Sequence, residues 1–421
     1  MSTLTETTPL LADILASIKP GAGLRADALA TLEQLGLPGS KSEEYKFTPI
    51  TRVLEKNFSF SDGNHETNIS NIGKFLIPDL EGNILVFING IFSEELSTYN
   101  HEELHIKPID GKEKGFASLA DFKSDALVAW NTAAWTSGVS LDVSANTEVH
   151  KPVILHYIND TTHSAAKSFT RNIIRLGKSS KLTVVEKQDT IGTHAGFSNV
   201  VTEGFIESNA ELHLYSIQAD GGKRFHFGQT TIWQDRNSRV NTFTLTLDGK
   251  LIRNNLQLIL DGEGCESHMN GLYILQGDTL ADNHTVVDHR KPNANSNELY
   301  KGVIDGNAKG VFNGKIYVRP DAQKTNAFQS NRNILLSDKA TVNTKPQLEI
   351  WADDVKCSHG CTTGQLDEEA MFYLQARGIS KVTARAMMLY AFAGEVLNTV
   401  DSGPLRNYFD SMISERLHKN F

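Results

Sequence analysis

The spacing of apolar residues divides the chain into a helical beginning, a long strand-rich middle and a helical end. Apolar residues recur at helical spacing over 10–18 and about 24–35, which predicts two helices. The polar stretch at about 58–80 predicts a loop, and the apolar run at 84–92 predicts a buried strand that turns at its Asn-Gly pair. The pattern over 117–136 is again helical.

From about 138 to 350 the pattern changes to short β-branched runs separated by Gly, Asn, Asp and Ser turns. One unit recurs, namely an apolar strand, a small polar turn and a second strand. The units begin at residues 173, 204, 231, 257, 302 and 333. Starts 26 to 31 residues apart, with one step of 45, are typical of a solenoid, and a repeat built only of strands predicts a β-helix. A sandwich or barrel is the alternative, since short strands with regular turns suit those folds too.

After Gly364 the pattern predicts three helices. Asp367 and Ser380 are the expected N-caps of the first two, and Ser402 with Pro404 introduces the third. The expected buried stripe of the second helix is Val382, Ala386, Leu389, Ala393 and Val396. The default role of this helical unit is to cap the last coil of the solenoid. Its surplus apolar side chains would instead suit the docking of a partner: Met371, Phe372, Met387, Met388 and Tyr408.

These patterns predict three regions: a helical and mixed region over 1–136, a β-helix core over 137–364 and a helical domain over 365–421. A length of 421 residues with 39% hydrophobic residues suits a globular protein too large for one compact domain. Within the first region, residues 41–48 combine charges with Tyr45 and Phe47, which predicts a solvated helical turn carrying two core aromatics.

Composition limits the cellular compartment and the classes of partner that we expect. No apolar run approaches the roughly 20 residues that span a bilayer, and the first ten residues carry no export signal, so no membrane association is expected. Three cysteines exclude a disulfide framework and fit a reducing cytoplasm. A net charge of −9 argues against nucleic acid, whose binders usually carry a basic face.

The chemically distinctive stretch is 351–364, which holds Cys357, His359 and Cys361 at strict alternation. If this stretch is extended, a period of two puts all three side chains on one face. Two thiols and an imidazole are soft ligands, suited to iron–sulfur, zinc or copper. Structural zinc and stable clusters usually take four ligands, and the only other cysteine is Cys265. This row of Cys357, His359 and Cys361 is therefore either inert or part of a site that another chain completes.

Signatures of common enzymes are absent from the sequence. Gly177-Lys178-Ser179 resembles the end of a phosphate-binding loop, but Asn172 stands where the first glycine should be. There is no Gly-x-Ser-x-Gly elbow and no His-Glu-x-x-His pair. We therefore expect a non-catalytic protein rather than an ATPase, dehydrogenase or hydrolase.

Several segments resemble one known family. They are Ala322–Ser337, Pro346–Ile350, Ala352–Gly360 and Phe372–Ile379, with Lys41–Thr48 near the start. In this order they resemble the SufB/SufD family of iron–sulfur cluster assembly scaffolds. The strong match covers about 300–395, whereas the β-rich middle agrees only in its general pattern of short strands and turns.

Two positions refine the resemblance. The run Val-Lys-Cys-Ser-His-Gly, which contains Cys357 and His359, is similar to the SufD branch of the family. Ser330 stands where SufB carries a functional cysteine. Cys361 is a departure, because SufD members have alanine at this position.

The resemblance implies a mainly β fold, with a right-handed parallel β-helix core between N-terminal and C-terminal helical regions. It implies pairing with SufB through the β-helix, docking of the SufC ATPase on the C-terminal helices, and a possible homodimer when the chain is isolated. It also implies that His359 contributes a ligand to a nascent, transient iron–sulfur cluster shared with SufB, with no bound nucleotide. Cys357 and Cys361 are the further candidate metal ligands. A structural zinc protein or a metal-free β-solenoid interaction module is the alternative.

Overall fold

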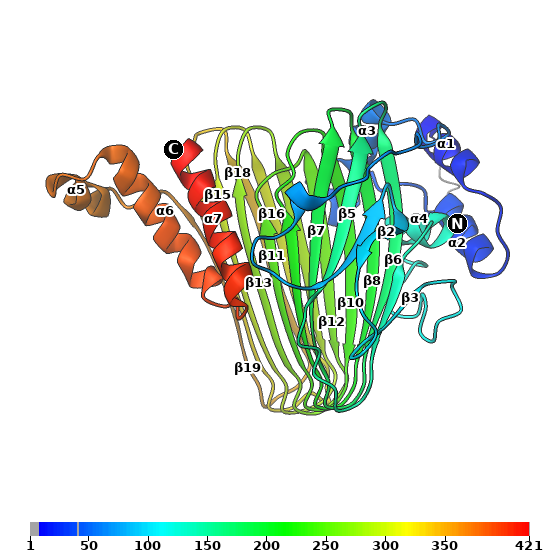
Figure 1. The fold of residues 1–421 in the computed structure, drawn as a ribbon. Coiled ribbons are helices and arrows are strands. Elements are labelled where there is room, and N and C mark those ends of the chain that lie inside the picture. The colour runs from blue at the N-terminus through cyan, green and yellow to red at the C-terminus, as the bar shows by residue number, and fades with distance from the viewer. Residues whose placement is uncertain (1–7, 40–41, 421) are drawn as a thin grey trace.

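The computed structural model describes residues 8–39 and 42–420, of which the middle forms a parallel β-helix built from two sheets (Figure 1). Sheet A contains β1 (Asn83–Ile88), β2 (Ile91–Thr98), β5 (Val153–Thr161), β7 (Lys181–Gly192), β9 (Glu211–Gln218), β11 (Arg239–Thr246), β13 (Glu266–Leu275), β15 (Asn295–Ile304), β17 (Asn326–Leu335) and β19 (Lys356–Gly364). Sheet B contains β3 (His105–Pro108), β4 (Val139–Val143), β6 (Ala166–Leu176), β8 (Gly196–Ile206), β10 (Arg224–Gln234), β12 (Leu251–Leu260), β14 (Leu280–His289), β16 (Lys309–Val318) and β18 (Thr341–Ile350).

The chain alternates between the two sheets, so each coil adds one strand to sheet A and one to sheet B. From β5 and β4 onward, neighbouring strands within a sheet are parallel and in register. This pairing confirms the predicted β-helix and excludes a sandwich or barrel of antiparallel strands. The predicted step of 45 residues was wrong as a repeat length. It joins residue 257 in β12 of sheet B to residue 302 in β15 of sheet A, whereas one repeat joins neighbouring strands of the same sheet.

One corner of the coil depends on residues in the left-handed backbone region. Asn146, Ser179, Asn209, Asn237 and Asn293 all have φ between 54° and 62°. Asparagine tolerates this conformation better than most residues because its short polar side chain bonds locally. At this corner the backbone N–H of Asn209 donates to the carbonyl of Arg236 in the next coil, at 2.9 Å, and Asn237 repeats the bond to Glu263. The predicted Asn/Ser turns therefore stack from coil to coil.

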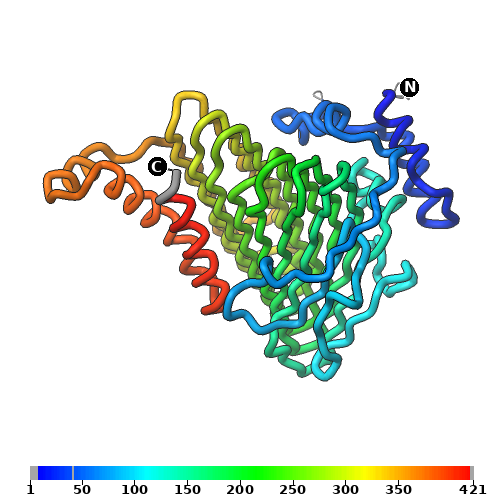
Figure 2. Tube along the Cα trace, turned by 45° about the horizontal axis from the view of Figure 1, so that its top comes forward, coloured from blue at the N-terminus to red at the C-terminus, as the bar shows by residue number. Residues whose placement is uncertain are grey.

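Helices flank the two ends of the β-helix (Figures 1 and 2). The N-terminal helices are α1 (Pro9–Ser17), α2 (Leu24–Leu35), α3 (Ile50–Asn57) and α4 (Ala126–Ala134), with short 3₁₀ turns at Glu43–Tyr45 and Gly73–Phe75. Their apolar faces pack with Trp130 against Phe197 and Phe225 on the outer face of sheet B. The predicted helices near residues 10 and 24 and the Asn89–Gly90 hairpin between β1 and β2 are confirmed.

The prediction of a helix over 117–136 was wrong in its first half and at Trp135, because α4 spans only Ala126–Ala134. Ala117 has a φ of 55°, which interrupts a helix. The backbone N–H groups of Ala117, Leu119 and Ala120 donate to the carboxylate of Glu203 at 2.7–3.0 Å. A buried side chain from β8 therefore replaces the bonds that a helix would have made.

The C-terminal helices are α5 (Glu368–Ala376), α6 (Lys381–Leu397) and α7 (Gly403–Asn420), and the predicted caps Asp367 and Ser380 are confirmed. The expectation that this unit caps the last coil was wrong, since α6 and α7 pack on the outer face of sheet A. Phe409 of α7 stacks on Phe243 of β11, with ring centroids 5.3 Å apart. Val382 was also misassigned to the buried stripe of α6, because 57% of it is exposed. Within the described part of the chain, no helix is long and apolar enough to cross a membrane.

Candidate metal centre

The predicted ligand row lies on β19, the last strand of sheet A (Figure 1). Within the described residues, β19 pairs along only one edge, with β17, and β18 is likewise the terminal strand of sheet B. Cys357, His359 and Cys361 are the register partners of Ala327, Gln329 and Asn331 on β17, all three of which are buried. The row therefore continues three columns of side chains that face the interior of the coil, here called the lumen, and the prediction that it occupies one face is confirmed.

The row stands at an open mouth of the lumen, because no further coil covers it in the described structure. Cys357 and Cys361 are half-buried and His359 is exposed. Alternate residues of a strand are about 6.6 Å apart, so the outer two positions are separated by about 13 Å and cannot share a single ion. Among residues 8–39 and 42–420, no group of three or more His, Cys, Asp or Glu is arranged to hold a metal ion. The roles of the three residues as ligands stay predictions.

The two thiols of the row differ from the imidazole in their surroundings. Burial raises the pKa of Cys357, which packs beside Leu348 and Val355, and burial also raises the pKa of Cys361. A raised pKa keeps a thiol protonated and weakens it as a ligand until a metal displaces the proton. Cys265 is fully buried, and its thiol lies 3.1 Å from the carbonyl of Gly262, so it packs as part of the hydrophobic core.

The lumen behind the row is polar for several coils. Asn331 donates to the hydroxyl of Tyr273 at 3.1 Å and accepts from Asn333 at 2.7 Å. Glu298 lies deeper in the same space, and burial raises its pKa to about 7. Buried polar groups usually find partners, and Asn331, Asn333 and Tyr273 find theirs in one another.

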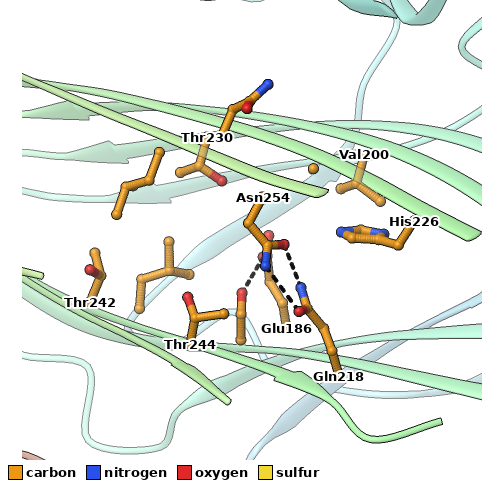
Figure 3. A pocket seen from close by; sticks show the side chains of 13 residues that line it. Glu186, Val200, Gln218, His226, Thr230, Thr242, Thr244 and Asn254 are labelled. Carbon is orange, nitrogen blue, oxygen red and sulfur yellow. Dashed lines mark hydrogen bonds between the residues drawn. The ribbon is translucent and has the colours of Figure 1, made fainter. Parts of the chain in front are cut away.

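A small polar cavity lies farther inside, between β7 and β12 (Figure 3). Glu186 accepts hydrogen bonds there from Ser216 at 2.9 Å and Thr202 at 3.1 Å, and burial raises its pKa. Burial lowers the pKa of His226 to about 3, so its ring is neutral. With a volume of about 40 Å³ the cavity has room for a few waters and not for a larger ligand. A cavity of this size offers no substrate site.

The charged segment near the N-terminus has partners that the sequence did not indicate. Glu44 forms an ion pair with His284 at 3.2 Å, and the guanidinium of Arg253 lies 4.0 Å from the ring centroid of Tyr45. The hydroxyl of Thr48 donates to Asp282. The segment is thus clamped on the outer face of sheet B. The prediction of two core aromatics was wrong for Phe47, which is 42% exposed, and Lys41 lies outside the described residues.

The C-terminal helices carry the most exposed apolar side chains near the mouth. Phe372 is 73% exposed and Met387 48% exposed, as expected for a docking surface, whereas Met371 is buried and Met388 and Tyr408 are partly covered. A groove of about 400 Å³ runs between α5, α6 and the turn after β17. Its apolar and charged lining includes Leu335, Leu336, Phe372, Lys381 and Arg385.

Comparison with protein-family models gives two matches that together span most of the chain. Residues 157–392 match the model described as SUF system FeS cluster assembly, SufBD core domain. Residues 16–155 match the model described as SufBD protein N-terminal region.

Individual relatives agree with these models. An iron–sulfur cluster assembly SufBD family protein of Synechocystis is 32% identical, over 93% of this chain and 90% of the relative. The iron–sulfur cluster assembly protein SufD of Escherichia coli is 27% identical, over 92% of this chain and 91% of that protein. SufD of Bacillus subtilis is 26% identical, over 69% of this chain and 67% of that protein.

Proposed function

The chain belongs to the SufBD family of the SUF system for iron–sulfur cluster assembly, and from this premise we propose that it is the SufD-type, non-catalytic scaffold subunit of a SufB–SufC–SufD complex. The observation that carries the proposal is the position of His359, an exposed soft ligand on the lumen face of an open β-helix end. A ligand set that is incomplete within one chain is the arrangement expected for a site shared between two.

In this proposal His359 contributes one ligand to a nascent cluster at the interface with SufB, and the cluster is cargo rather than a resident cofactor. Cys357 and Cys361 are secondary candidates, since burial keeps their thiols protonated. A mixed site at an interface should hold a cluster less firmly than four thiolates from one chain would. Weak retention suits a subunit whose product must leave.

The terminal strands β18 and β19 are the surface we assign to SufB. Their outer edges present backbone N–H and C=O groups to solvent, and such edges pair readily with a strand from another chain. Ile350 ends β18 and Trp351 follows it; they are 40% and 48% exposed, which adds apolar area beside the edge. In the absence of SufB the same edges can pair two copies of this chain, so a homodimer in isolation is part of the proposal.

We assign docking of the SufC ATPase to the surface formed by α5 and α6, with nucleotide binding confined to that partner. The exposed Phe372 and the adjoining groove support this assignment. Lys301 of β15, which is buried, donates to the carbonyl of Phe392 in α6 at 2.8 Å and pairs with Glu395. Movement of α6 would therefore be transmitted to a strand two positions from β19.

We further propose a cytoplasmic protein, because its three cysteines are unpaired, and a division into units 1–136, 137–364 and 365–421. The last coil ends at Gly364 and the following helix starts at Glu368, which supports the second boundary.

Co-expression with SufB and SufC partners tests the proposal. Wild type is compared with His359→Ala and with Thr363→Ala, a control on the same face of β19. We expect all three to co-purify as a complex, and only His359→Ala to lose the visible absorption of the anaerobically reconstituted cluster. An unchanged cluster in His359→Ala contradicts the ligand role. Stoichiometric zinc bound to Cys357, His359 and Cys361 in the isolated chain would instead favour a structural zinc protein.

A further inference from the structure

We propose that Gln329 is a positioning residue for His359: its amide oxygen accepts a hydrogen bond from the imidazole, and Glu298 fixes the orientation of that amide. The inference rests on the proposed function, since it assigns a partner to the proposed cluster ligand. It concerns residues that face the lumen directly behind the mouth.

The three residues form one column across three coils. Glu298 on β15 pairs in register with Gln329 on β17, and Gln329 pairs in register with His359 on β19. Neighbouring parallel strands lie about 4.8 Å apart, so side chains in one column are within reach of those directly above and below. His359 is thus the solvent-facing end of a column whose inner members are buried.

The hydrogen bonds of Gln329 determine which of its atoms remains available. Its amide nitrogen Nε2 donates to Oε2 of Glu298 at 2.7 Å. This bond favours the ionised form of Glu298, which accepts and does not donate, so the nitrogen faces Glu298 and the oxygen faces elsewhere. Gln329 is only 3% exposed, and its Oε1 has no hydrogen-bond partner among the described residues. A buried acceptor without a partner is unfavourable, and its neighbour on the open side is an imidazole that can donate.

The space around the amide leaves little freedom. A Cβ atom placed on Gly314 of β16 would lie 2.2 Å from Nε2 of Gln329, so the amide rests against bare backbone across the lumen. Glu298, which is 1% exposed, holds the other side. The amide is therefore fixed before His359 binds anything.

The neighbouring columns offer no equivalent acceptor. Behind Cys361, the side-chain nitrogen of Asn331 donates to Tyr273 and its oxygen accepts from Asn333. Behind Cys357 lies Ala327, which has no polar side-chain atom. Among the three positions that back the row, Gln329 alone has a spare acceptor, and it lies behind the histidine.

This arrangement matches what a metal-binding imidazole requires. One ring nitrogen binds the metal through its lone pair, and the other carries a proton that usually donates to an oxygen of the protein. A bond to Gln329 would fix the tautomer and the ring orientation of His359. The exposed ring has the freedom to turn inward when the mouth is closed by a partner.

The test uses the co-expressed complex with Gln329→Met, a replacement of similar shape that cannot accept the bond. We expect the complex to form and the cluster to be lost to a chelator about 10–100-fold faster than in wild type. The imidazole-nitrogen coupling in the electron paramagnetic resonance spectrum of the reduced cluster should change as well. Gln218→Met is the matched control, because Gln218 is a buried lumen amide on β9, far from the mouth.

A charge swap keeps the test decisive if Gln329→Met fails to fold. The double variant Glu298→Gln/Gln329→Glu retains an amide–carboxyl pair and puts an acceptor oxygen beside His359, so it should restore slow cluster loss. Wild-type loss rates in Gln329→Met, or rapid loss in the swap, would overturn the inference. If His359→Ala removes the cluster while Gln329→Met behaves as wild type, only this inference fails. An unchanged cluster in His359→Ala would contradict the proposed function itself.

Discussion

Arg171 and Glu203 are charged side chains without any exposure to solvent, and they form an ion pair with each other. The guanidinium donates from Nη2 to Oε2 of Glu203 at 3.0 Å and from Nη1 to Thr132 at 2.7 Å. Glu203 also accepts the three backbone N–H groups that precede α4. This pair ties the irregular segment before α4 to the neighbouring strands β6 and β8 of sheet B.

Removing one member of this pair should be strongly destabilising. We expect Glu203→Ala to lower the free energy of unfolding by about 3–5 kcal/mol, because Arg171 would remain buried without its counter-charge. Urea denaturation of the isolated chain measures the difference. Glu81→Ala is the control, since Glu81 forms a surface ion pair with Lys151 and is 85% exposed. Equal midpoints for the two variants would contradict this account.

At the scale of elements, the corner of each coil requires a left-handed residue. Asn209 has a φ of 60°, which a β-branched side chain adopts only with strain. Asn209→Val should therefore destabilise the protein by about 1–2 kcal/mol, whereas Asn209→Gly should remain close to wild type. Thermal or urea unfolding of both variants checks this, and a Val variant as stable as the Gly variant would contradict it.

The N-terminal segment provides a pH-dependent contact with sheet B. Burial opposes the charge of His284, but the carboxylates of Asp282 and Glu44 outweigh burial and the nearby Arg253, and they raise its pKa above the ordinary value. A group with a raised pKa stabilises the fold fully below its ordinary pKa, near 6.5 for histidine. That contribution is lost as the pH rises through the raised value.

Wild type should accordingly exceed His284→Gln in stability at about pH 6, and the difference should shrink toward about pH 9. Unfolding free energies of both proteins across this range provide the measurement. His268→Gln on sheet A serves as the control, because His268 is 40% exposed and lies away from the clamp. A difference that grows with pH would show that another group dominates.

These elements also mark the limit of what the sequence predicts. The caps Asp367 and Ser380, the Asn-Gly hairpin and the alternation of the row are local patterns, and each predicted its element correctly. The ion pair of Glu44 with His284 joins residues 240 positions apart, and no local pattern indicates it. The side on which α6 and α7 pack, and the open mouth beside His359, likewise depend on how whole elements associate.

At the scale of the whole molecule, the two assigned partner surfaces belong to different parts of the architecture. The edge of β18 and β19 is made by sheet backbone and ends the lumen. The apolar side chains of the second surface lie on α6, which packs on the outer face of sheet A, and on α5, which extends beyond it (Figure 1). A change on one surface should therefore leave binding at the other intact.

The substitution Phe372→Asp tests whether the two surfaces bind their partners independently. Because 73% of Phe372 is exposed and it lines the groove beside α6, a charge there should abolish co-purification with SufC without unfolding the chain. SufB should still co-purify, since the strand edges are untouched. Ile91→Asp is the matched control, because Ile91 is 62% exposed on β2 and distant from α5. Loss of both partners in Phe372→Asp would mean that the helices and the strand edge form one continuous interface, and the route from SufC to His359 would then be direct contact rather than movement of α6.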